Sequence, residues 1–468
     1  MRSYGTGPRR ERRFSFFRLL VLLVIVASVP AALIAYRMTD RSAPVVNLVG
    51  APKAIGRSTK ITIETAEPRY GIREARAILV QADREFPLAS VSNPATPWWR
   101  LRRGEAIRPS LRLEGEAGSE RMPQLKEGPV TIRAEATNDS PARFGKGRTT
   151  RVEVTLPVLL KPPRVEVLSG QHYINQGGSE CVLYRVSEPT EVSGVRAGSY
   201  FFHGYPKPGG APGERFAFFA FPYDLSASTV PVLVARDAAG NETVASFPFK
   251  LFPKRFRDAN IDLTDDFLRR VVPAILSESP SIKSQGDLLK DFLEINSHLR
   301  RDDAAALVDL SGKSRTEFLW KGPFVQLGSS KVMASFADHR SYVYRGRVVD
   351  HQDHLGFDLA VTANHPVDAA NDGVVLMARF FGIYGNTVVI DHGYGLMTLY
   401  SHLSSIDVKE GQPVRRGDPI GRSGATGLAG GDHLHFSVLL QGVPVDPREW
   451  WDAHWIRDRI ESKIGPRA

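Results

Sequence analysis

The feature that most constrains this chain is an apolar run near its beginning, from Leu19 to Ala35. Four arginines precede the run, and these are Arg9, Arg10, Arg12 and Arg13. Seventeen consecutive apolar or small residues are close to the shortest helix that spans a bilayer, and basic residues remain on the cytoplasmic side. We therefore predict a basic cytoplasmic tail and an uncleaved signal-anchor helix in residues 1–42, with the rest of the chain exported.

A cleaved signal peptide is the competing interpretation, because it also combines a basic start with an apolar centre. The residues after Ala35 read YRMTDR and contain no clean small-x-small cleavage site. This favours an anchor that stays in the membrane.

The length of 468 residues exceeds what one hydrophobic core normally organises, so three or more domains are expected. The single cysteine, Cys181, excludes an intrachain disulfide, and stability must come from hydrophobic cores or a metal. Cys181 lies in the alternating run SECVLYRV. We interpret it as a buried strand residue and not as a nucleophile.

The formal net charge of +10 is partly local, because the first thirteen residues hold five arginines and one glutamate. The remaining mild excess favours encounter with an anionic polymer such as cell wall. The sequence contains no nucleic-acid-binding motif, so no nucleic-acid partner is predicted.

A repeated pattern follows the apolar segment. Residues Val45 to Pro68 align with residues Arg164 to Pro189, and each copy has a short strand, a glycine-containing turn, an alternating strand and a Glu-Pro stop. We predict two β-sandwich domains, at 43–160 and 161–256, joined near Leu160 to Pro163. The second contains a hairpin turn at DAAGN. Both resemble immunoglobulin-like domains in pattern only, and a spacer or partner-binding role is expected.

The periodicity changes to helical after Thr264, which is a plausible N-cap followed by two aspartates. A second segment places apolar residues at helical spacing, at Leu288, Phe292, Ile295 and Leu299. We predict a short helical connector at 257–312, whose apolar stripe packs internally or docks a regulatory protein. Glycine-rich alternating runs then predict an antiparallel β domain at 313–456, and residues 457–468 are predicted to be a basic tail. The expected fold class is therefore multidomain and mainly β.

Eight of the twelve histidines lie between Gly322 and Trp451, in the glycine-rich β region. In GGDHLHFSV, His433 and His435 are two residues apart, so on a strand they share a face. In HLGFD, His354 and Asp358 are four apart and also share a face in an extended chain. Two imidazoles and a carboxylate are a typical catalytic zinc set, which would use His354, Asp358 and His435, although a lone His-x-His is more often a coincidence.

The motifs HLGFDLA, YGNTVVIDHG, TLYSHL, GRSGATG and GGDHLHFSV occur in one order between Phe336 and Asp446. In this region the chain resembles the lysostaphin/LytM-type zinc metallopeptidases, which cleave peptide cross-links of bacterial peptidoglycan. The resemblance implies one Zn²⁺ per chain on His354, Asp358 and His435. It also implies that His402 and His433 are active-site histidines that do not bind the metal, and it implies a glycine-rich approach at Gly421, Gly424 and Gly427.

We predict further substrate contacts in this domain, at Tyr384, Asn386, Tyr400, Gly424 and Thr426. The other histidines are interpreted as structural, cleft-lining or solvent-exposed, and these are His339, His351, His365 and His392. His351 is the alternative to His354 as a metal ligand, because it lies only three residues before His354.

The resemblance implies a zinc endopeptidase that acts on peptidoglycan. We expect one helix to anchor it in the bacterial inner membrane, with most of the chain in the periplasm. No His-Glu-x-x-His motif is present, so histidine must supply the general acid and base that a glutamate supplies elsewhere. Two alternatives remain. One is a catalytically silent cell-wall regulator that activates an amidase, and the other is an adhesion module built on the β-sandwiches.

Overall fold

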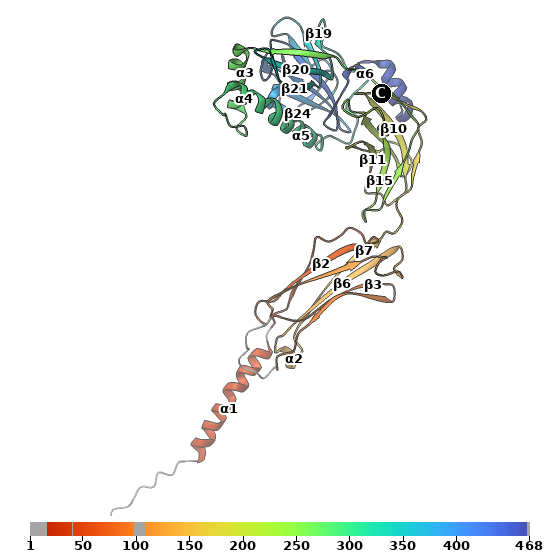
Figure 1. The fold of residues 1–468 in the computed structure, drawn as a ribbon. Coiled ribbons are helices and arrows are strands. Elements are labelled where there is room, and N and C mark those ends of the chain that lie inside the picture. Colours follow the sequence, from red (N-terminus) through yellow and green to blue (C-terminus); the bar gives the residue numbers. More distant parts are fainter. Residues whose placement is uncertain (1–15, 40, 98–107, 466–468) are drawn as a thin grey trace, which may run out of the picture. The chain divides into compact units, whose positions relative to one another are not determined.

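The structure is a computed structural model that describes residues 16–39, 41–97 and 108–465. The chain divides into two compact units, Met1–Pro162 with Ala238–Asn241, and Pro163–Asp237 with Glu242–Ala468. Figure 1 shows the elements of both units, and each unit is described separately below. The predicted arginine cluster at positions 9 to 13 lies outside the described residues.

The predicted anchor is one continuous helix, α1 (Phe16–Met38), drawn in red in Figure 1. Residues Phe17–Tyr36 are apolar and long enough to cross a bilayer, and they are not buried against other described residues. Leu22, Leu23 and Val26 are exposed. An apolar surface of this kind is stable in lipid and unfavourable in water.

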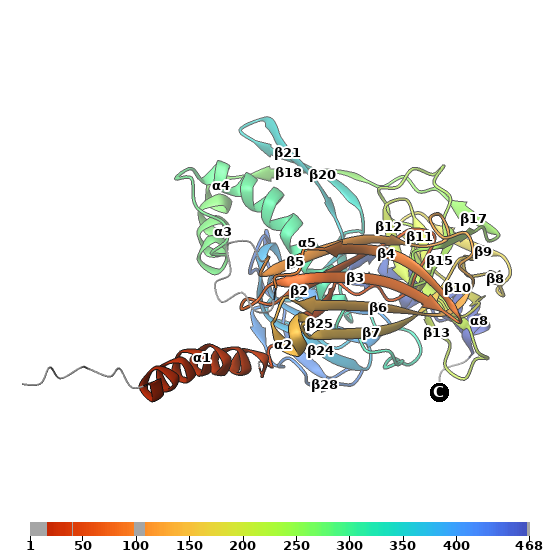
Figure 2. The same ribbon diagram turned by 90° about the horizontal axis from the view of Figure 1, so that it is seen from below.

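The first unit contains a two-sheet β-sandwich, as the alternating pattern predicts. Figure 2 shows strands β3, β6 and β7 side by side, in agreement with the register. One sheet has the order β1-β2-β5 and the other β4-β3-β6-β7. The strands are β1 (Val45–Val49), β2 (Thr59–Ala66), β3 (Ile72–Gln81), β4 (Arg84–Ser92), β5 (Ser110–Ala117), β6 (Gly128–Asn138) and β7 (Thr149–Val158), with a short helix α2 (Ala142–Gly145) before β7. Inward residues of both sheets, such as Ile63, Leu79 and Ile132, form one buried cluster.

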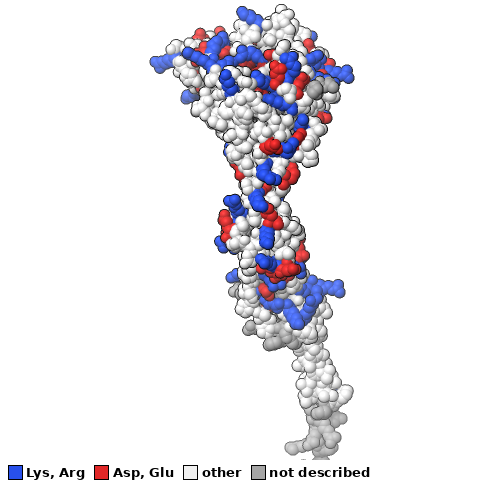
Figure 3. Space-filling view, turned by 90° about the vertical axis from the view of Figure 1, so that its right-hand side faces the viewer, with Lys and Arg blue, Asp and Glu red and all other residues white. Residues whose placement is uncertain are grey.

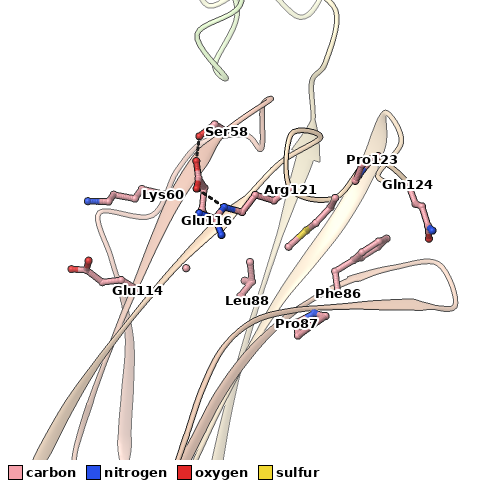
Figure 4. A pocket seen from close by; sticks show the side chains of 12 residues that line it. Ser58, Lys60, Phe86, Pro87, Leu88, Glu114, Glu116, Arg121, Pro123 and Gln124 are labelled. Carbon is pink, nitrogen blue, oxygen red and sulfur yellow. Dashed lines mark hydrogen bonds and ion pairs between the residues drawn. The ribbon is translucent and has the colours of Figure 1, made fainter.

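The edge strands β4 and β5 of this sandwich border an open groove, which Figure 4 shows. Phe86 and Leu88 contribute to its apolar wall, and Glu116 accepts hydrogen bonds from Ser58 and from Arg121 on the polar side. The predicted binding role of this sandwich stays a prediction. On the face shown in Figure 3, basic and acidic side chains are interspersed.

The second sandwich also forms two sheets, with the orders β13-β14-β10-β8 and β12-β11-β15-β16, beside a parallel pair of β9 and β17. Its strands are β8 (Val165–Val167), β9 (His172–Asn175), β10 (Ser179–Val186), β11 (Val192–Ala197), β12 (Tyr200–His203), β13 (Tyr205–Pro206), β14 (Glu214–Ala220), β15 (Val232–Arg236), β16 (Glu242–Ala245) and β17 (Phe249–Phe252). The predicted hairpin is confirmed, because β15 pairs with β16 across residues 237–241. Cys181 is fully buried in β10, as predicted.

The predicted connector is helical only in part. It begins with a strand, β18 (Asp258–Leu263), and continues as α3 (Asp265–Glu278), α4 (Leu288–Glu294), a π-helical turn η1 (Ile295–Leu299) and α5 (Arg300–Ser311). Thr264 caps α3 as expected, because its hydroxyl accepts a hydrogen bond from the Phe267 backbone N–H at 3.1 Å. Strand β18 was missed because it is short and its outward residues are polar.

The connector is part of the second unit and not a spacer. Strand β18 pairs in parallel with β20 (Asp338–Tyr344), which pairs with β21 (Arg347–His354). The predicted helical stripe packs on these strands, since Phe292 and Ile295 share a buried cluster with Tyr342. Figures 1 and 2 both show α3 and α4 beside this three-stranded sheet.

The C-terminal domain is built on an eight-stranded sheet whose neighbouring strands pair antiparallel. Its order is β19-β22-β30-β26-β25-β24-β28, and β31 pairs with β30. These strands are β19 (Lys331–Ala334), β22 (Phe357–Ala360), β24 (Gly373–Phe381), β25 (Gly385–Gly393), β26 (Leu396–Ser401), β28 (Pro413–Val414), β30 (Leu434–Leu440) and β31 (Val443–Val445). A smaller sheet has the order β23-β29-β27, from β23 (Pro366–Asp368), β29 (Pro419–Arg422) and β27 (Ser405–Ile406).

The second sandwich and the C-terminal domain share one hydrophobic core, although we expected separate domains. Strand β14 buries residues on both of its faces, so its pattern lacks the alternation of a strand with one face in water. Its Phe216 contacts Tyr394, and Phe218 contacts Trp450, with ring centroids 5.0 Å and 5.9 Å apart. This aromatic contact explains why residues 163–237 and 242–468 form one unit.

Where the structure describes the predicted basic tail, it is helical and packed, and its positions 466–468 lie outside the described residues. After α6 (Pro447–Trp451), the chain forms α7 (Ala453–Ile456), η3 (Arg457–Glu461) and α8 (Ser462–Ile464). Ile460 is fully buried, and Lys463 Nζ lies 2.7 Å from Glu180 Oε1 of strand β10. The lysine and arginine content concealed the few apolar positions that pack.

Glu449 of α6 makes the stability of this shared core depend on pH. Its carboxylate accepts hydrogen bonds from Asn175 Nδ2 (2.8 Å) and from Ser179 N (2.6 Å) and Oγ (3.0 Å). Burial raises the pKa of Glu449 to about 7. Because a raised pKa means that the folded state holds the proton more tightly, the stabilisation from that proton is complete below about pH 4 and is lost as the pH rises to about 7.

We expect Glu449→Gln to remove this dependence. The wild type should lose about 3 kcal/mol of unfolding free energy between pH 4 and pH 7.5 that the variant does not lose. The difference in unfolding free energy, variant minus wild type, should therefore increase by that amount. Denaturant unfolding at the two pH values measures the change, and Glu410→Gln, at an exposed position, is the matched control. A difference between wild type and Glu449→Gln that stays constant with pH would contradict the prediction.

Candidate metal centre and substrate groove

Strand register brings the predicted ligands together. Asp358 of β22 is the direct cross-strand partner of His435 of β30, and directly opposed residues of neighbouring strands present their side chains on one face. His354 is the last residue of β21, and the turn through Gly356 leads from it to β22. A Cβ atom on Gly356 would lie 2.5 Å from His435 Nε2, so only glycine allows this close turn.

The three candidate ligand atoms are close enough to hold one ion. His354 Nε2 lies 2.8 Å from Asp358 Oδ1 and 2.9 Å from His435 Nδ1, and His435 Nδ1 lies 2.9 Å from Asp358 Oδ1. His354 is 4% exposed, Asp358 9% and His435 5%. The group is therefore compact and largely shielded from water.

The outer nitrogen of each imidazole has a partner that fixes its hydrogen. His354 Nδ1 donates to the Ser335 carbonyl oxygen at 2.9 Å. The Ser437 hydroxyl donates to the Leu355 carbonyl at 2.8 Å, so its oxygen accepts from His435 Nε2 at 3.1 Å. Burial also lowers the pKa of His435 to about 4, which keeps this imidazole neutral.

As a result, two imidazole lone pairs and one carboxylate oxygen of Asp358 face one another without a hydrogen between them. Such an arrangement is repulsive by itself and becomes favourable around a cation. Nitrogen and oxygen donors of this number are a set that suits zinc. The donor set thus fits a bound metal.

Asp358 has a second partner that the sequence did not reveal. Its Oδ2 accepts a hydrogen bond from Arg340 NH2 of β20 at 2.8 Å, while Oδ1 faces the histidines. Arg340 therefore fixes the carboxylate with one oxygen turned to the ligand cluster.

His402 and His433 lie beside this cluster with their Nε2 atoms free of backbone partners. His402 Nδ1 donates to Thr426 O and His433 Nδ1 donates to Gly431 O, both at 2.8 Å. Their ring centroids are 4.9 Å apart, and the His402 ring is 5.7 Å from that of His435. His433 Nε2 lies 3.4 Å from Asp358 Oδ1, at the edge of the ligand group.

The two imidazoles differ in electrostatic surroundings. Burial lowers the pKa of His402 well below its ordinary value. Burial also lowers the pKa of His433, but the hydrogen bond and charge of Asp358 outweigh it, so that its pKa is raised. His402 also adopts φ = +61°, a backbone conformation that is rare outside glycine and often marks a functional position.

A groove lies over the cluster, and its walls come from outside the C-terminal sheet as well as from it. All five predicted site residues, which are four histidines and Asp358, line the groove together with Tyr384 and the glycines before His433. The opposite side comes from β18, β20 and the connector helices, at Arg257, Ile261, Phe267, Arg300, Arg340 and Tyr342. The connector is therefore a wall of the groove.

Of the predicted substrate contacts, the structure places only Tyr384 in this wall. Tyr400 is 1% exposed, and its hydroxyl accepts a hydrogen bond from Ala370 N, so it belongs to the core. Asn386 and Thr426 both donate to the Leu403 carbonyl from behind the groove. Asn386 and Thr426 thus position the segment after β26, and Tyr400 is a core residue, so none of the three lines the groove.

Gly424 is also a supporting residue. It pairs with His433, whose backbone N–H donates to the Gly424 carbonyl at 3.0 Å. A Cβ atom here would lie 2.6 Å from Ser404 N, and similar crowding applies at Gly421 and Gly427. The predicted glycines thus permit close backbone packing next to the two active-site histidines.

The other histidines lie apart from the ligand cluster. His392 is fully buried and hydrogen-bonded to Asp372 O and Thr398 Oγ1. His339 contacts Asp353 at 2.5 Å, and both His351 and His339 are exposed. His365 is hydrogen-bonded through its backbone to Ser423.

Connector helices hold both loops that carry site residues. Arg270 of α3 donates to the carbonyls of Ala429 and Gly430. Asp303 of α5 accepts a hydrogen bond at 2.9 Å from Ile383 N, in the turn η2 (Gly382–Tyr384). Burial raises the pKa of Asp303 to about 6.

We expect Asp303→Ala to lower the free energy of unfolding by about 1–3 kcal/mol, because the Ile383 N–H loses its acceptor in a buried site. Turnover should also fall, since the same turn positions Tyr384. Denaturant unfolding is the measurement, with the exposed neighbour substituted as Asp302→Ala for comparison. Equal stability of the two variants would show that the Asp303 contact does not hold the turn.

Comparison with known proteins identifies the C-terminal domain. Residues 352–447 match the family model described as Peptidase family M23. Peptidoglycan DD-endopeptidase ShyA of Vibrio cholerae is 43% identical over 116 residues, which are 25% of this chain and 26% of that protein. DD-carboxypeptidase/endopeptidase Mpg of Neisseria meningitidis is 45% identical over 94 residues, which are 20% of this chain and 22% of that protein.

A solved structure of the catalytic domain of lysostaphin from Staphylococcus simulans is 24% identical to this chain. The match covers 31% of this chain and 96% of that structure, with a TM-score of 0.21.

The C-terminal part of the chain is thus an M23 peptidase domain, homologous to these peptidases, and this family implies a metal. The chain spans about a quarter of the length of the curated relatives it matches, at 26% and 22%. The match begins at residue 352 and so includes all the predicted ligands and both further histidines, but not β18, β20 or the connector helices.

Proposed function

We propose that this protein is a zinc-dependent endopeptidase that hydrolyses peptide cross-links of bacterial peptidoglycan. The observation that carries the proposal is the set of lone pairs of His354, Asp358 and His435, which converge at the base of a groove within an M23 domain. Relatives named as peptidoglycan DD-endopeptidases support the choice of substrate.

In this proposal His354 Nε2, His435 Nδ1 and Asp358 Oδ1 hold the zinc ion. When bound, zinc acts as a Lewis acid that lowers the pKa of water and polarises a carbonyl group. Arg340, Ser335 and Ser437 keep the ligands in the orientation that this requires.

His402 and His433 supply the proton transfers of the reaction. Their Nδ1 atoms are committed to backbone carbonyls, so the Nε2 atoms are available to the groove. From there, one imidazole takes the proton of the attacking water and one delivers a proton to the leaving amine, which balances the hydrolysis of one amide bond. Both residues also orient the substrate carbonyl.

The apolar helix α1 supports a location at the inner membrane by a single span, with the sandwiches and the peptidase domain in the periplasm. The first sandwich would then act as a spacer between the membrane and the peptidase unit. A regulatory partner at the sandwiches or the connector helices stays part of this proposal.

The test is to incubate the full chain, in detergent, with purified peptidoglycan and to identify the released peptides by mass spectrometry. The proposal predicts new amino and carboxyl termini at cross-links, and their loss with a chelator. Intact cross-links in the presence of zinc would overturn it and favour the catalytically silent regulator.

A further inference from the structure

The groove contains three arginines that are not part of the M23 match, and they differ in how their charge is balanced. Arg340 pairs with Asp358, and Arg257 pairs with Asp338. Arg300 lies in the same groove wall, and in the described part of the chain no carboxylate oxygen lies within 4.0 Å of its guanidinium nitrogens. Arg300 therefore forms no direct ion pair, although its charge also acts on the buried carboxyl of Asp303.

Arg300 is nevertheless held in place. Its Nε donates to the Asn296 carbonyl at 3.2 Å, and NH2 donates to Asn296 Oδ1 at 2.7 Å. Asn296 is fully buried, and its Nδ2 donates to Asp350 Oδ2 at 2.7 Å. Asp350 therefore fixes which way the Asn296 amide points, and the amide oxygen fixes the guanidinium.

This arrangement leaves hydrogen-bond donors available in the groove. A guanidinium has five N–H groups, and the hydrogen bonds to Asn296 engage only Nε and NH2. An arginine that is half-buried, oriented by neutral acceptors and only partly bonded is suited to receive a carboxylate in a bidentate manner.

Tyr384 connects Arg300 to the reaction site. The turn η2 that carries Tyr384 contacts η1 and α5, and Arg300, the first residue of α5, lines the same groove as Tyr384. On its other side, the Tyr384 ring lies 5.8 Å from the ring of His435. A peptide bound over the metal ligands would therefore lie in the same groove that Arg300 lines.

We infer that Arg300 recognises a free carboxylate of the peptide substrate, next to the bond that is cut. This deepens the proposed function and rests on it, because it names an acidic peptide as the substrate class.

The experiment uses two synthetic cross-linked peptides that differ in one group. In one, a diamino acid contributes the scissile amide and has a free carboxylate beside it, and in the other this carboxylate is a carboxamide. We compare wild type with Arg300→Gln, with Arg300→Lys and with Arg301→Gln, which changes an exposed neighbour. Metal content and thermal unfolding of each variant confirm that the fold is unchanged.

The expected result is a preference of about 10- to 100-fold in kcat/KM for the free carboxylate in wild type and in Arg301→Gln. Arg300→Gln should lose this preference, mainly through KM, and Arg300→Lys should regain part of it. A preference that survives in Arg300→Gln, or no preference in wild type, would overturn the inference while leaving the proposed peptidase function intact.

If no variant cuts either peptide, the proposed function fails separately, and binding then decides the role of Arg300. Fluorescence anisotropy with the same two peptides and metal-free protein measures it. Tighter binding of the free carboxylate by wild type and not by Arg300→Gln would support the inference, and equal binding by both would contradict it.

Discussion

Asp358→Ala is expected to lose both the bound metal and the hydrolytic activity. The substitution removes one of three ligand atoms and leaves the guanidinium of Arg340 without its acceptor. Because the metal contributes several kcal/mol to transition-state stabilisation, turnover should fall by at least about a thousand-fold. Elemental analysis and a cleavage assay on the same sample measure the two effects.

The matched control for this prediction is Asp368→Ala, an exposed aspartate of the same domain. It should keep one metal per chain and full turnover. An Asp358→Ala protein that retains the metal and the activity would show that the ligand set lies elsewhere.

His433→Ala is expected to separate catalysis from metal binding. Its Nε2 lies 3.4 Å from Asp358 Oδ1, farther than the three atoms of the ligand cluster lie from one another. We therefore predict that metal content stays at one per chain while kcat falls by about a hundred- to ten-thousand-fold, as for the loss of a general acid or base. Metal analysis and steady-state kinetics check this.

His351→Ala is the comparison for His433→Ala, because His351 is exposed and is the residue that competed in register with His354. The His351→Ala substitution should leave both the metal content and kcat unchanged. Loss of metal from His433→Ala would make His433 a ligand, and loss of metal from His351→Ala would overturn the ligand assignment of His354.

Each half of the ligand cluster could be anticipated because its spacing is local to a strand or turn, whereas the meeting of the two halves depends on register between β22 and β30 and was implied by the resemblance. A period of two places His433 and His435 on one face, and a glycine turn joins His354 to Asp358. Ser437 could have been found by the same rule, since it is two residues beyond His435 on the same strand. The sequence-based prediction failed where roles depend on register between distant strands, as for Tyr400, whose alternation alone did not show that its hydroxyl is bonded in the core.

The connector shows a second limit of prediction from the sequence, which is long-range packing. Its helical stripe was predicted, but nothing local indicates that β18 pairs with β20 or that Asp303 accepts from Ile383, 80 residues later. Likewise, the last residues were interpreted as a basic tail because packing of Ile460 and pairing of Lys463 with Glu180 depend on a partner strand far away in the chain. Contacts of this kind are decided by tertiary packing and leave no periodic signal.

The most direct test of the account is a titration of zinc into metal-free protein while cross-link cleavage is followed. We predict no cleavage without metal, a rise in rate that is linear in added zinc, and a plateau at one zinc per chain. Full activity of the metal-free protein, or no activity at any zinc level with intact cross-links as the substrate, would contradict it.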